Sequence, residues 1–252
     1  MSKGRFITVE GIDGAGKTML TKRLAERLER SRHPVTCTRE PTDDAIGSII
    51  RNALGGRLWV APEAMGLLFA ADRWDHTRRV ILPALDQGKV VLCDRYDYSN
   101  LVYRAAETPG PLFRCARPRC GWEGEPGDAT GIWPEMSCPR CLDDATLADA
   151  VVDRLEWTRS LTDGVPEPDL ILVLSLRAEE AAARLRERGS KPELYENTRM
   201  LERCALLYAD AHETLRRPSE NVMVIDAARP PLVVLEAALN AVRVLLEEDD
   251  EG

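Results

Sequence analysis

FITVEGIDGAGKTMLTKRL, Phe6–Leu24, starts as an apolar strand pattern, turns through glycines and continues with leucines four residues apart, which is typical of a helix. Between strand and helix lies Gly-x4-Gly-Lys-Thr, from Gly11 to Thr18, in the context that a phosphate-binding loop requires. A plain glycine-rich turn is the alternative, but strand, loop, Lys-Thr and helix all fall in register. We therefore predict a nucleoside triphosphate site.

Each residue type in this loop suits a phosphate group for a physical reason. Gly11, Gly14 and Gly16 let the backbone curl so that its N–H groups face phosphate oxygens, and the start of the helix adds positive potential. Lys17 is expected to reach the β and γ phosphates, and the Thr18 hydroxyl is expected to take a place on Mg²⁺.

Strand patterns and helix patterns alternate along the rest of the chain. The apolar runs are continuous rather than alternating, as in strands buried on both faces; they are Arg5–Glu10, Val35–Thr38, Lys89–Cys93, Asp169–Leu176 and Val222–Ile225. Longer amphipathic stretches cover Pro62–Leu85, Asp143–Leu161, Ala178–Glu187, Asn197–Leu215 and Pro231–Glu247. This order predicts one three-layer α/β domain over residues 1–252, with a roughly five-stranded parallel sheet.

Composition excludes several classes of protein. With 44% hydrophobic and 30% charged residues the 252-residue chain has an ordinary globular composition, and its net charge of −8 argues against a broad electrostatic grip on nucleic acid. Its apolar runs fall short of the roughly 18 to 20 residues of a membrane span. We expect a cytoplasmic protein, whose thiols stay reduced.

Residues 108–142 lack any periodicity and hold four cysteines, Cys115-x4-Cys120 and Cys138-x2-Cys141. A stretch this long without structure is uncommon inside a compact domain, so we predict a small module of its own. The two pairs have a spacing close to that of a zinc ribbon, and four thiolates fill a tetrahedral zinc shell, which predicts a structural site. Free surface thiols, a redox pair and bound iron are the alternatives.

Four further motifs follow the phosphate loop in order. They are TREPTDDAIGSIIR (Thr38–Arg51), LLFAADRWDHTRRVILPAL (Leu67–Leu85), VVLCDRYDYSNLVY (Val90–Tyr103) and EPDLILVLSL (Glu167–Leu176). With the phosphate loop, this ordered set resembles the thymidylate kinase family over nearly the whole chain apart from the cysteine module. The resemblance implies a P-loop kinase fold, usually homodimeric, that moves the γ-phosphoryl group of Mg·ATP onto dTMP to give dTDP.

Arginines from several segments are expected to bring the two anionic substrates together. By resemblance, Arg51 and Arg95 hold the acceptor phosphate, Arg73 donates to the thymine carbonyl, and Phe69 stacks on the ring. Asp94 ends the third strand, where open α/β sheets place their ligands, and is a candidate for positioning Mg²⁺ directly or through water.

The resemblance also implies a sugar site. Asp13 lies where the family places a carboxylate that binds the 3′-hydroxyl, and Glu40 is expected to assist it. Asn100 and Tyr103 match positions that line the nucleoside pocket, where the tyrosine ring would crowd a 2′-hydroxyl. Arg104 stands where many bacterial members have a base-reading Gln, so a kinase of another or modified deoxynucleoside monophosphate is an alternative.

A lid is expected after the fourth strand. In the family, a basic residue that neutralises the transferring phosphoryl group comes from the phosphate loop or from the lid, and here the loop has Gly14 and Ala15. The lid must then supply it, from Arg184, Arg186 or Arg188. A third hypothesis, from a different class, is a nucleotide-regulated nucleic-acid-binding protein that reads through the ribbon, whose arginines are Arg114, Arg117, Arg119 and Arg140.

Overall fold

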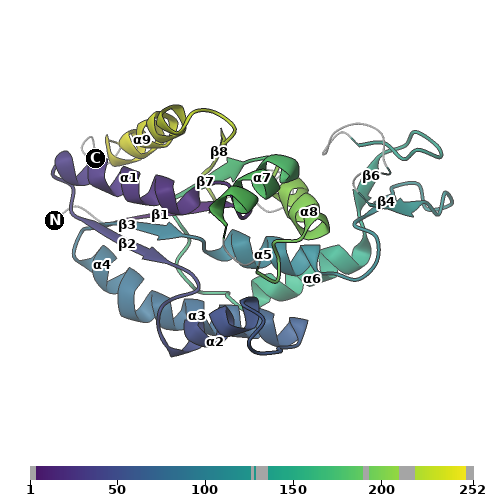
Figure 1. Ribbon diagram of the computed structural model, residues 1–252, viewed down its shortest axis with the longest axis horizontal. Coiled ribbons are helices and arrows are strands. Elements are labelled where there is room, and N and C mark those ends of the chain that lie inside the picture. Colours follow the sequence, from purple (N-terminus) through teal and green to yellow (C-terminus); the bar gives the residue numbers. More distant parts are fainter. Residues whose placement is uncertain (1–3, 126–127, 129–135, 190–192, 210–218, 248–252) are drawn as a thin grey trace.

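The computed structural model describes residues 4–125, 128, 136–189, 193–209 and 219–247 (Figure 1). Its elements are, in order, β1 (Arg5–Gly11), α1 (Lys17–Arg30), β2 (Val35–Arg39), α2 (Ala45–Leu54), α3 (Pro62–His76), the π-helix η1 (Thr77–Ile81), α4 (Leu82–Asp86), β3 (Val90–Asp94), α5 (Asp97–Ala106), β4 (Phe113–Cys115), β5 (Glu123–Gly124), β6 (Ala145–Leu147), α6 (Asp149–Ser160), β7 (Leu170–Ser175), α7 (Ala178–Arg188), α8 (Thr198–Ala209), β8 (Val222–Asp226) and α9 (Pro231–Glu247).

The main sheet is parallel throughout, in the order β2-β3-β1-β7-β8. The five predicted strands and the three-layer α/β fold are therefore confirmed. Helices α1 and α9 lie together on one side of the sheet, and α3 and α4 lie on the other (Figure 1). In α1, the three leucines Leu20, Leu24 and Leu28 are buried in the main core, which explains the four-residue spacing.

The helix predictions were mostly right; two differ in extent, one is tested only in part, and two helices were missed. The pattern over Pro62–Leu85 is α3, η1 and α4 in succession. The helix predicted over Asp143–Leu161 begins only at Asp149, because Ala145–Leu147 pairs with β4 as a strand. Helix α8 ends at Ala209, and residues 210–215 of the predicted helix Asn197–Leu215 lie outside the described part of the chain. Helices α2 and α5 were not among the predicted elements.

A second, antiparallel sheet, in the order β5-β4-β6, lies beyond α6 and α8 and away from the main sheet (Figure 1). It is attached to the body by Phe113, Met136 and Ala145, which are buried in the main core. Among the described residues, no helix has both the length and the apolar character needed to cross a membrane.

Candidate active site

The phosphate loop joins β1 to α1 through backbone conformations that favour glycine. Gly14 and Gly16 have φ values of +83° and +95°, in the left-handed region. A Cβ on Gly14 would lie 2.8 Å from the carbonyl oxygen of Ala181, so this glycine also lets the loop approach α7 closely. The loop backbone is thus free to wrap around a phosphate group at the start of α1.

Lys17 and Thr18 open α1 beside the end of β3. The Lys17 ammonium is buried and donates to the Ile12 carbonyl at 2.8 Å. Burial and, to a lesser extent, the nearby charge of Arg95 together lower the pKa of Lys17 to about 8, against the opposing effect of the neighbouring carboxylates. The Thr18 hydroxyl donates to Asp94 Oδ2, which brings together the two groups predicted for Mg²⁺.

Arg95 follows β3 with a φ of +72°, which is unusual for a residue with a side chain. Its guanidinium donates to Asp13 Oδ1 in the phosphate loop and to Ser99 Oγ at 3.0 Å. The Tyr103 hydroxyl donates to the other oxygen of Asp13 at 2.8 Å. Burial raises the pKa of Asp13, but the charges of Arg95 and Lys17 outweigh it and hold that pKa below its usual value.

Glu10 was missed by the sequence reasoning, although a carboxylate within a buried apolar strand is a recognisable signal. It is fully buried in β1 and accepts hydrogen bonds from the Tyr96 N–H at 2.7 Å, from Ser99 Oγ and from the Tyr208 hydroxyl at 3.2 Å. Burial raises its pKa. Glu10 thereby fixes the turn that carries Arg95.

A second buried network of hydrogen bonds is centred on Glu40. Arg73 donates to Glu40 Oε2 at 2.7 Å, to Asp97 Oδ1 at 3.1 Å and to the Tyr96 carbonyl at 2.7 Å, while its Nε has no partner. His76 Nδ1 lies 3.0 Å from the other oxygen of Glu40. Arg73 is 1% exposed and holds Glu40 in place, so in this structure it is bound to protein groups rather than presented to a ligand.

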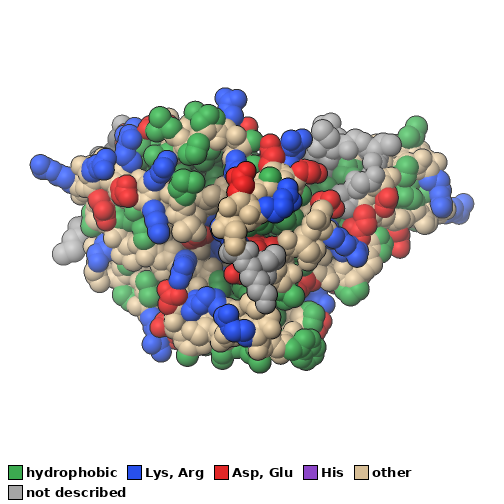
Figure 2. Space-filling model, viewed as in Figure 1, with side chains coloured by type: hydrophobic (Ala, Val, Ile, Leu, Met, Phe, Trp, Pro, Cys, Tyr) green, Lys and Arg blue, Asp and Glu red, His purple; other side chains and the backbone are tan. Residues whose placement is uncertain are grey.

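A cavity of about 720 Å³ is lined by the phosphate loop, Asp94 and Arg95. Its volume is typical of a small-molecule site. The predicted residues that line it are Asp13, Gly14, Gly16, Lys17, Thr18, Glu40, Arg51, Phe69, Asp94, Arg95, Asn100, Tyr103, Arg184 and Arg188. Lysine and arginine side chains gather over α1 and α2 beside it (Figure 2). Gly11, Arg73 and Arg186 do not line it, and the sequence reasoning missed Glu193, Tyr195 and Arg229, which do.

Asn100 and Arg51 are two lining residues with contrasting bonding. The Asn100 side chain is 3% exposed, and both its amide nitrogen and its amide oxygen are buried without a hydrogen-bond partner. The Arg51 guanidinium is partly exposed, donates to the carbonyls of Pro41 at 3.1 Å and Thr42, and lies 3.4 Å from Asp43. Unpaired buried amides are costly, so the Asn100 amide is suited to a ligand.

The three lid arginines of α7 differ in their contacts. Arg184 donates to the Ala227 carbonyl at 2.9 Å, next to the start of α9. Arg188 donates to Glu196 Oε1 at 2.6 Å, across the segment that follows α7. Arg186 is exposed and does not line the cavity. Arg184 and Arg188 are therefore the better placed for a phosphate group.

The protein family and the relatives that this chain resembles are described as thymidylate kinases. The family model described as "Thymidylate kinase" matches residues 9–123. A probable thymidylate kinase of Caldivirga maquilingensis is 32% identical over 249 residues, which cover 98% of this chain and 95% of that protein. The chain belongs to the thymidylate kinase family. A probable thymidylate kinase of Pyrococcus abyssi is 36% identical over 196 residues, covering 76% of this chain and 74% of the relative.

A solved structure shows the same fold. The thymidylate kinase from Candida albicans superposes with a TM-score of 0.68 and 21% sequence identity, over 99% of this chain and 94% of the other. At that identity the likeness supports the family fold and carries no residue roles.

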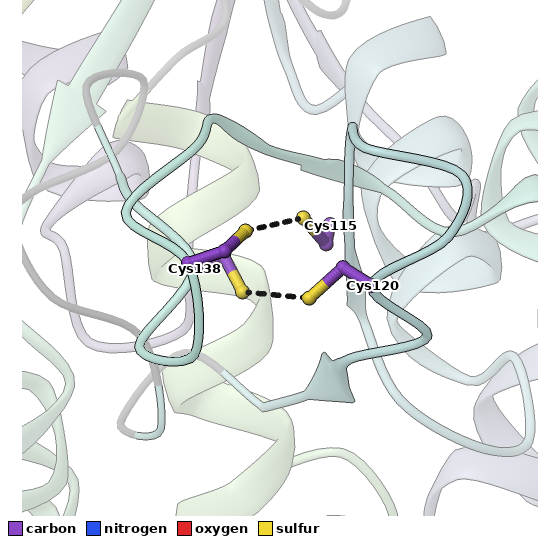
Figure 3. A group of neighbouring side chains, drawn as sticks. Cys115, Cys120 and Cys138 are labelled. Carbon is purple, nitrogen blue, oxygen red and sulfur yellow. Dashed lines mark hydrogen bonds between the residues drawn. The ribbon is translucent and has the colours of Figure 1, made fainter.

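This member of the thymidylate kinase family brings its four predicted zinc ligands together. The sulfur atoms of Cys115, Cys120, Cys138 and Cys141 all lie within 4.8 Å of one another, and the labelled side chains point toward a common centre (Figure 3). The closest pairs are Cys115 with Cys141 at 3.4 Å and Cys120 with Cys138 at 3.6 Å. The backbone N–H groups two residues after Cys115 and after Cys138 donate to those sulfurs at 3.4 Å.

The cysteine module does not contribute to the lining of the 720 Å³ cavity as far as the described residues go. Its contacts run instead to α8 and α6. Glu125 pairs with Arg199 at 2.8 Å and lies 3.7 Å from the buried Arg203, both on α8. Arg114 and Arg117 are paired with Asp149 and Asp143. This pairing leaves the module less basic than its arginines alone indicate.

Proposed function

We propose that this protein is a dTMP kinase, which transfers the γ-phosphoryl group of Mg·ATP to dTMP and releases dTDP. The observation that carries the proposal is that the phosphate loop with Lys17 lines the same cavity as Arg95, which is held between Asp13 and Ser99. Phosphoryl transfer asks the protein mainly to position two phosphates and neutralise their charge, and this cavity has groups for both.

On the donor side, Gly11, Gly14 and Gly16 shape the loop around the phosphates of ATP. Lys17 neutralises the β and γ phosphates, and its position at the start of α1 adds the potential of the helix. Thr18 and Asp94 supply hydroxyl and carboxylate oxygens, the ligand type that Mg²⁺ prefers, so these residues fit the metal directly or through water. Bound Mg²⁺ would neutralise phosphate charge and orient the γ-phosphoryl group.

On the acceptor side, we assign the phosphate of dTMP to Arg95 and Arg51. Asp13 holds the sugar 3′-hydroxyl, and its low pKa keeps it an acceptor. The Tyr103 ring, fixed by its bond to Asp13, crowds the 2′ position and favours a deoxyribose. Glu40, held by Arg73, assists at this end.

For the base, we assign stacking to Phe69 and readout to Asn100. The free amide of Asn100 can donate to a thymine carbonyl and accept from the adjacent ring N–H, which satisfies both of its unpaired atoms at once. The contact of Arg73 with a thymine carbonyl rests on the resemblance alone, because Arg73 does not line the cavity and its one unpaired nitrogen, Nε, is buried. Arg104 is bound elsewhere and takes no part in readout.

For the lid, we assign the charge that stabilises the transferring phosphoryl group to Arg188, with Arg184 on ATP. Both line the cavity, whereas Arg186 would need lid closure to reach it. Coupling this charge to closure restrains hydrolysis in the open state.

We further propose that residues 108–142 are an insertion held by one structural zinc ion. Tetrahedral zinc with bonds of about 2.3 Å places its sulfur ligands about 3.8 Å apart, which the observed separations of 3.4 to 4.8 Å bracket. Four thiolates leave no open position, so the metal would stabilise the module and take no part in the reaction.

A panel of nucleoside monophosphates tests the activity. With Mg·ATP, purified protein should release ADP fastest with dTMP; a clear preference for another deoxynucleotide would favour the alternative kinase. ATP hydrolysis stimulated by nucleic acid, with no monophosphate preferred, would reject both kinase proposals. The paired arginines of the module give the nucleic-acid reading little support.

Assembly and location complete the proposal. We propose a homodimer through the face formed by α2, α3 and the loop between them, which exposes Ile49, Leu58, Trp59 and Leu67. Analytical ultracentrifugation should give the mass of a dimer, and Leu67→Glu should shift it to a monomer. A cytoplasmic location suits a cluster of reduced thiols, and imaging of a tagged chain tests it.

A further inference from the structure

Arg104 on α5 is among the most deeply buried charged residues that the structure describes, with 1% exposure. Its guanidinium joins α5 to two segments that are distant in the sequence. It donates to the Pro62 carbonyl at the start of α3 at 3.1 Å, donates to the Tyr195 hydroxyl at 2.6 Å, and forms an ion pair with Glu107. Tyr195 belongs to the segment that follows the lid helix α7.

The rings on either side of Arg104 form part of the cavity wall. Its guanidinium carbon lies 5.9 Å from the centroid of the Phe69 ring and 5.3 Å from that of Tyr195. The Tyr195 ring lies in turn 5.3 Å from that of Tyr103, whose hydroxyl binds Asp13. Phe69, Tyr103 and Tyr195 all line the cavity, whereas Arg104 contacts the rings of Phe69 and Tyr195 and does not line the cavity itself.

Two simpler roles fit these contacts less well. A base-reading role would require a free donor that faces the cavity. Arg104 does not line the cavity, both of its terminal nitrogens have partners, and its unpaired Nε is buried. A purely structural role would account for the pair with Glu107, the residue that caps the end of α5. It would not account for the bond to Tyr195, which belongs to a segment whose neighbours Glu193 and Glu196 also line the cavity.

We propose that Arg104 is a positioning residue that seats the lid tyrosine Tyr195 against Tyr103 and Phe69, so that the lid completes the wall of the acceptor site. This inference rests on the proposed dTMP kinase activity. Tyr195 follows α7, the lid helix that carries Arg184 and Arg188, so the position of Tyr195 in the acceptor wall is coupled to the binding of ATP by the lid. A nucleotide that closes the lid should tighten the binding of the monophosphate, and the monophosphate should tighten the nucleotide to the same degree.

Two variants test the proposal, Arg104→Gln and Tyr195→Phe. The second removes only the hydroxyl and leaves the Arg104–Glu107 pair intact, so it guards against a folding defect. Calorimetry would measure the Kd of dTMP with and without a non-hydrolysable ATP analogue, alongside kcat and KM. We expect each variant to weaken dTMP about tenfold in the presence of the analogue, the usual loss for a hydrogen bond to a charged group. The double variant should lose no more than either single variant.

Tyr98→Phe is the matched control. Like Tyr195→Phe, it removes one buried tyrosine hydroxyl, which here lies on α5 and donates to Glu220 at 2.8 Å. Unlike Tyr195, Tyr98 does not line the cavity. Its dTMP affinity should equal that of the wild type. Variants that melt earlier yet keep wild-type Kd and KM for dTMP would overturn the role of Arg104. Wild-type protein that neither binds nor phosphorylates dTMP would instead refute the proposed function.

Discussion

Replacing Asn100 with leucine should stabilise the free protein and damage dTMP binding at the same time. The side chain is 3% exposed, and neither its amide nitrogen nor its amide oxygen has a partner. A buried polar group without a partner costs about 1 to 3 kcal/mol, and leucine has the same branched shape with no polar atom to satisfy. We expect the free energy of unfolding to rise by about 1 to 2 kcal/mol, which for a chain of this size raises Tm by about 2 to 8 °C.

The effect on the substrate should have the opposite sign. Once the amide is gone, the edge of the base enters a buried site with nothing to pair with, so KM for dTMP should rise about ten- to a hundredfold. KM for ATP should stay within about twofold, since Asn100 lies on α5 rather than on the phosphate loop or the lid. Differential scanning calorimetry and steady-state ADP release measure the two quantities on the same preparation.

Asn197→Leu is the control for the stability part. The Asn197 side chain is exposed and well partnered, since its oxygen accepts the Met200 N–H at 3.0 Å and caps α8. Loss of such a cap costs about 0.5 to 2 kcal/mol, so the same chemical change should lower Tm here. An Asn100→Leu protein with lowered Tm and unchanged KM for dTMP would refute the assignment of this amide to the ligand.

Three other perturbations have expected outcomes. Burial lowers the pKa of Lys17 to about 8, so the charged ammonium is lost as pH rises through that value. We therefore expect kcat/KM for ATP to fall above about pH 8. The variant Lys17→Arg, which stays charged, should not show this fall in its pH profile. Cys138→Ser should abolish zinc binding in elemental analysis and destabilise the module by several kcal/mol, whereas Cys37→Ser, at an exposed thiol, should do neither. Glu125→Gln should speed hydrogen exchange in α8, because it removes a charged partner of Arg203; unchanged exchange would contradict that coupling.

The strands were predictable because burial on both faces makes their sequences continuously apolar. Helix α5, DYSNLVYRAA, was missed for the converse reason: the face that it buries includes Asn100, Tyr103 and Arg104, so polar side chains occupy positions where the helix period requires apolar ones. The strand β6 was read as the start of a helix, because three residues paired across a small sheet carry too little pattern to separate them from the helix that follows.

The candidate site likewise has residues that the sequence predicted and residues that it did not. The phosphate loop and Arg95 were found because their chemistry is local, with the loop, the strand end and the helix start all adjacent in sequence. Glu193 and Tyr195 reach the cavity from the segment after α7, and the role of Tyr195 depends on a partner about 90 residues away, Arg104. A sequence pattern shows which residue types are available, but not which of several arginines is already bound by protein groups, as Arg73 is.

The position of the cysteine module bears on what loss of its metal would do. Its described residues do not reach the cavity, whereas Glu125 contacts Arg199 and Arg203 on α8, directly after the lid segment. Arg203 is 4% exposed, and burial lowers its pKa, so the carboxylate beside it compensates a charge that is costly to bury. Disorder in the module should therefore loosen α8 first. We expect zinc-free protein to lose affinity for ATP, which depends on the lid, before it loses the discrimination between bases, which depends on α3 and α5.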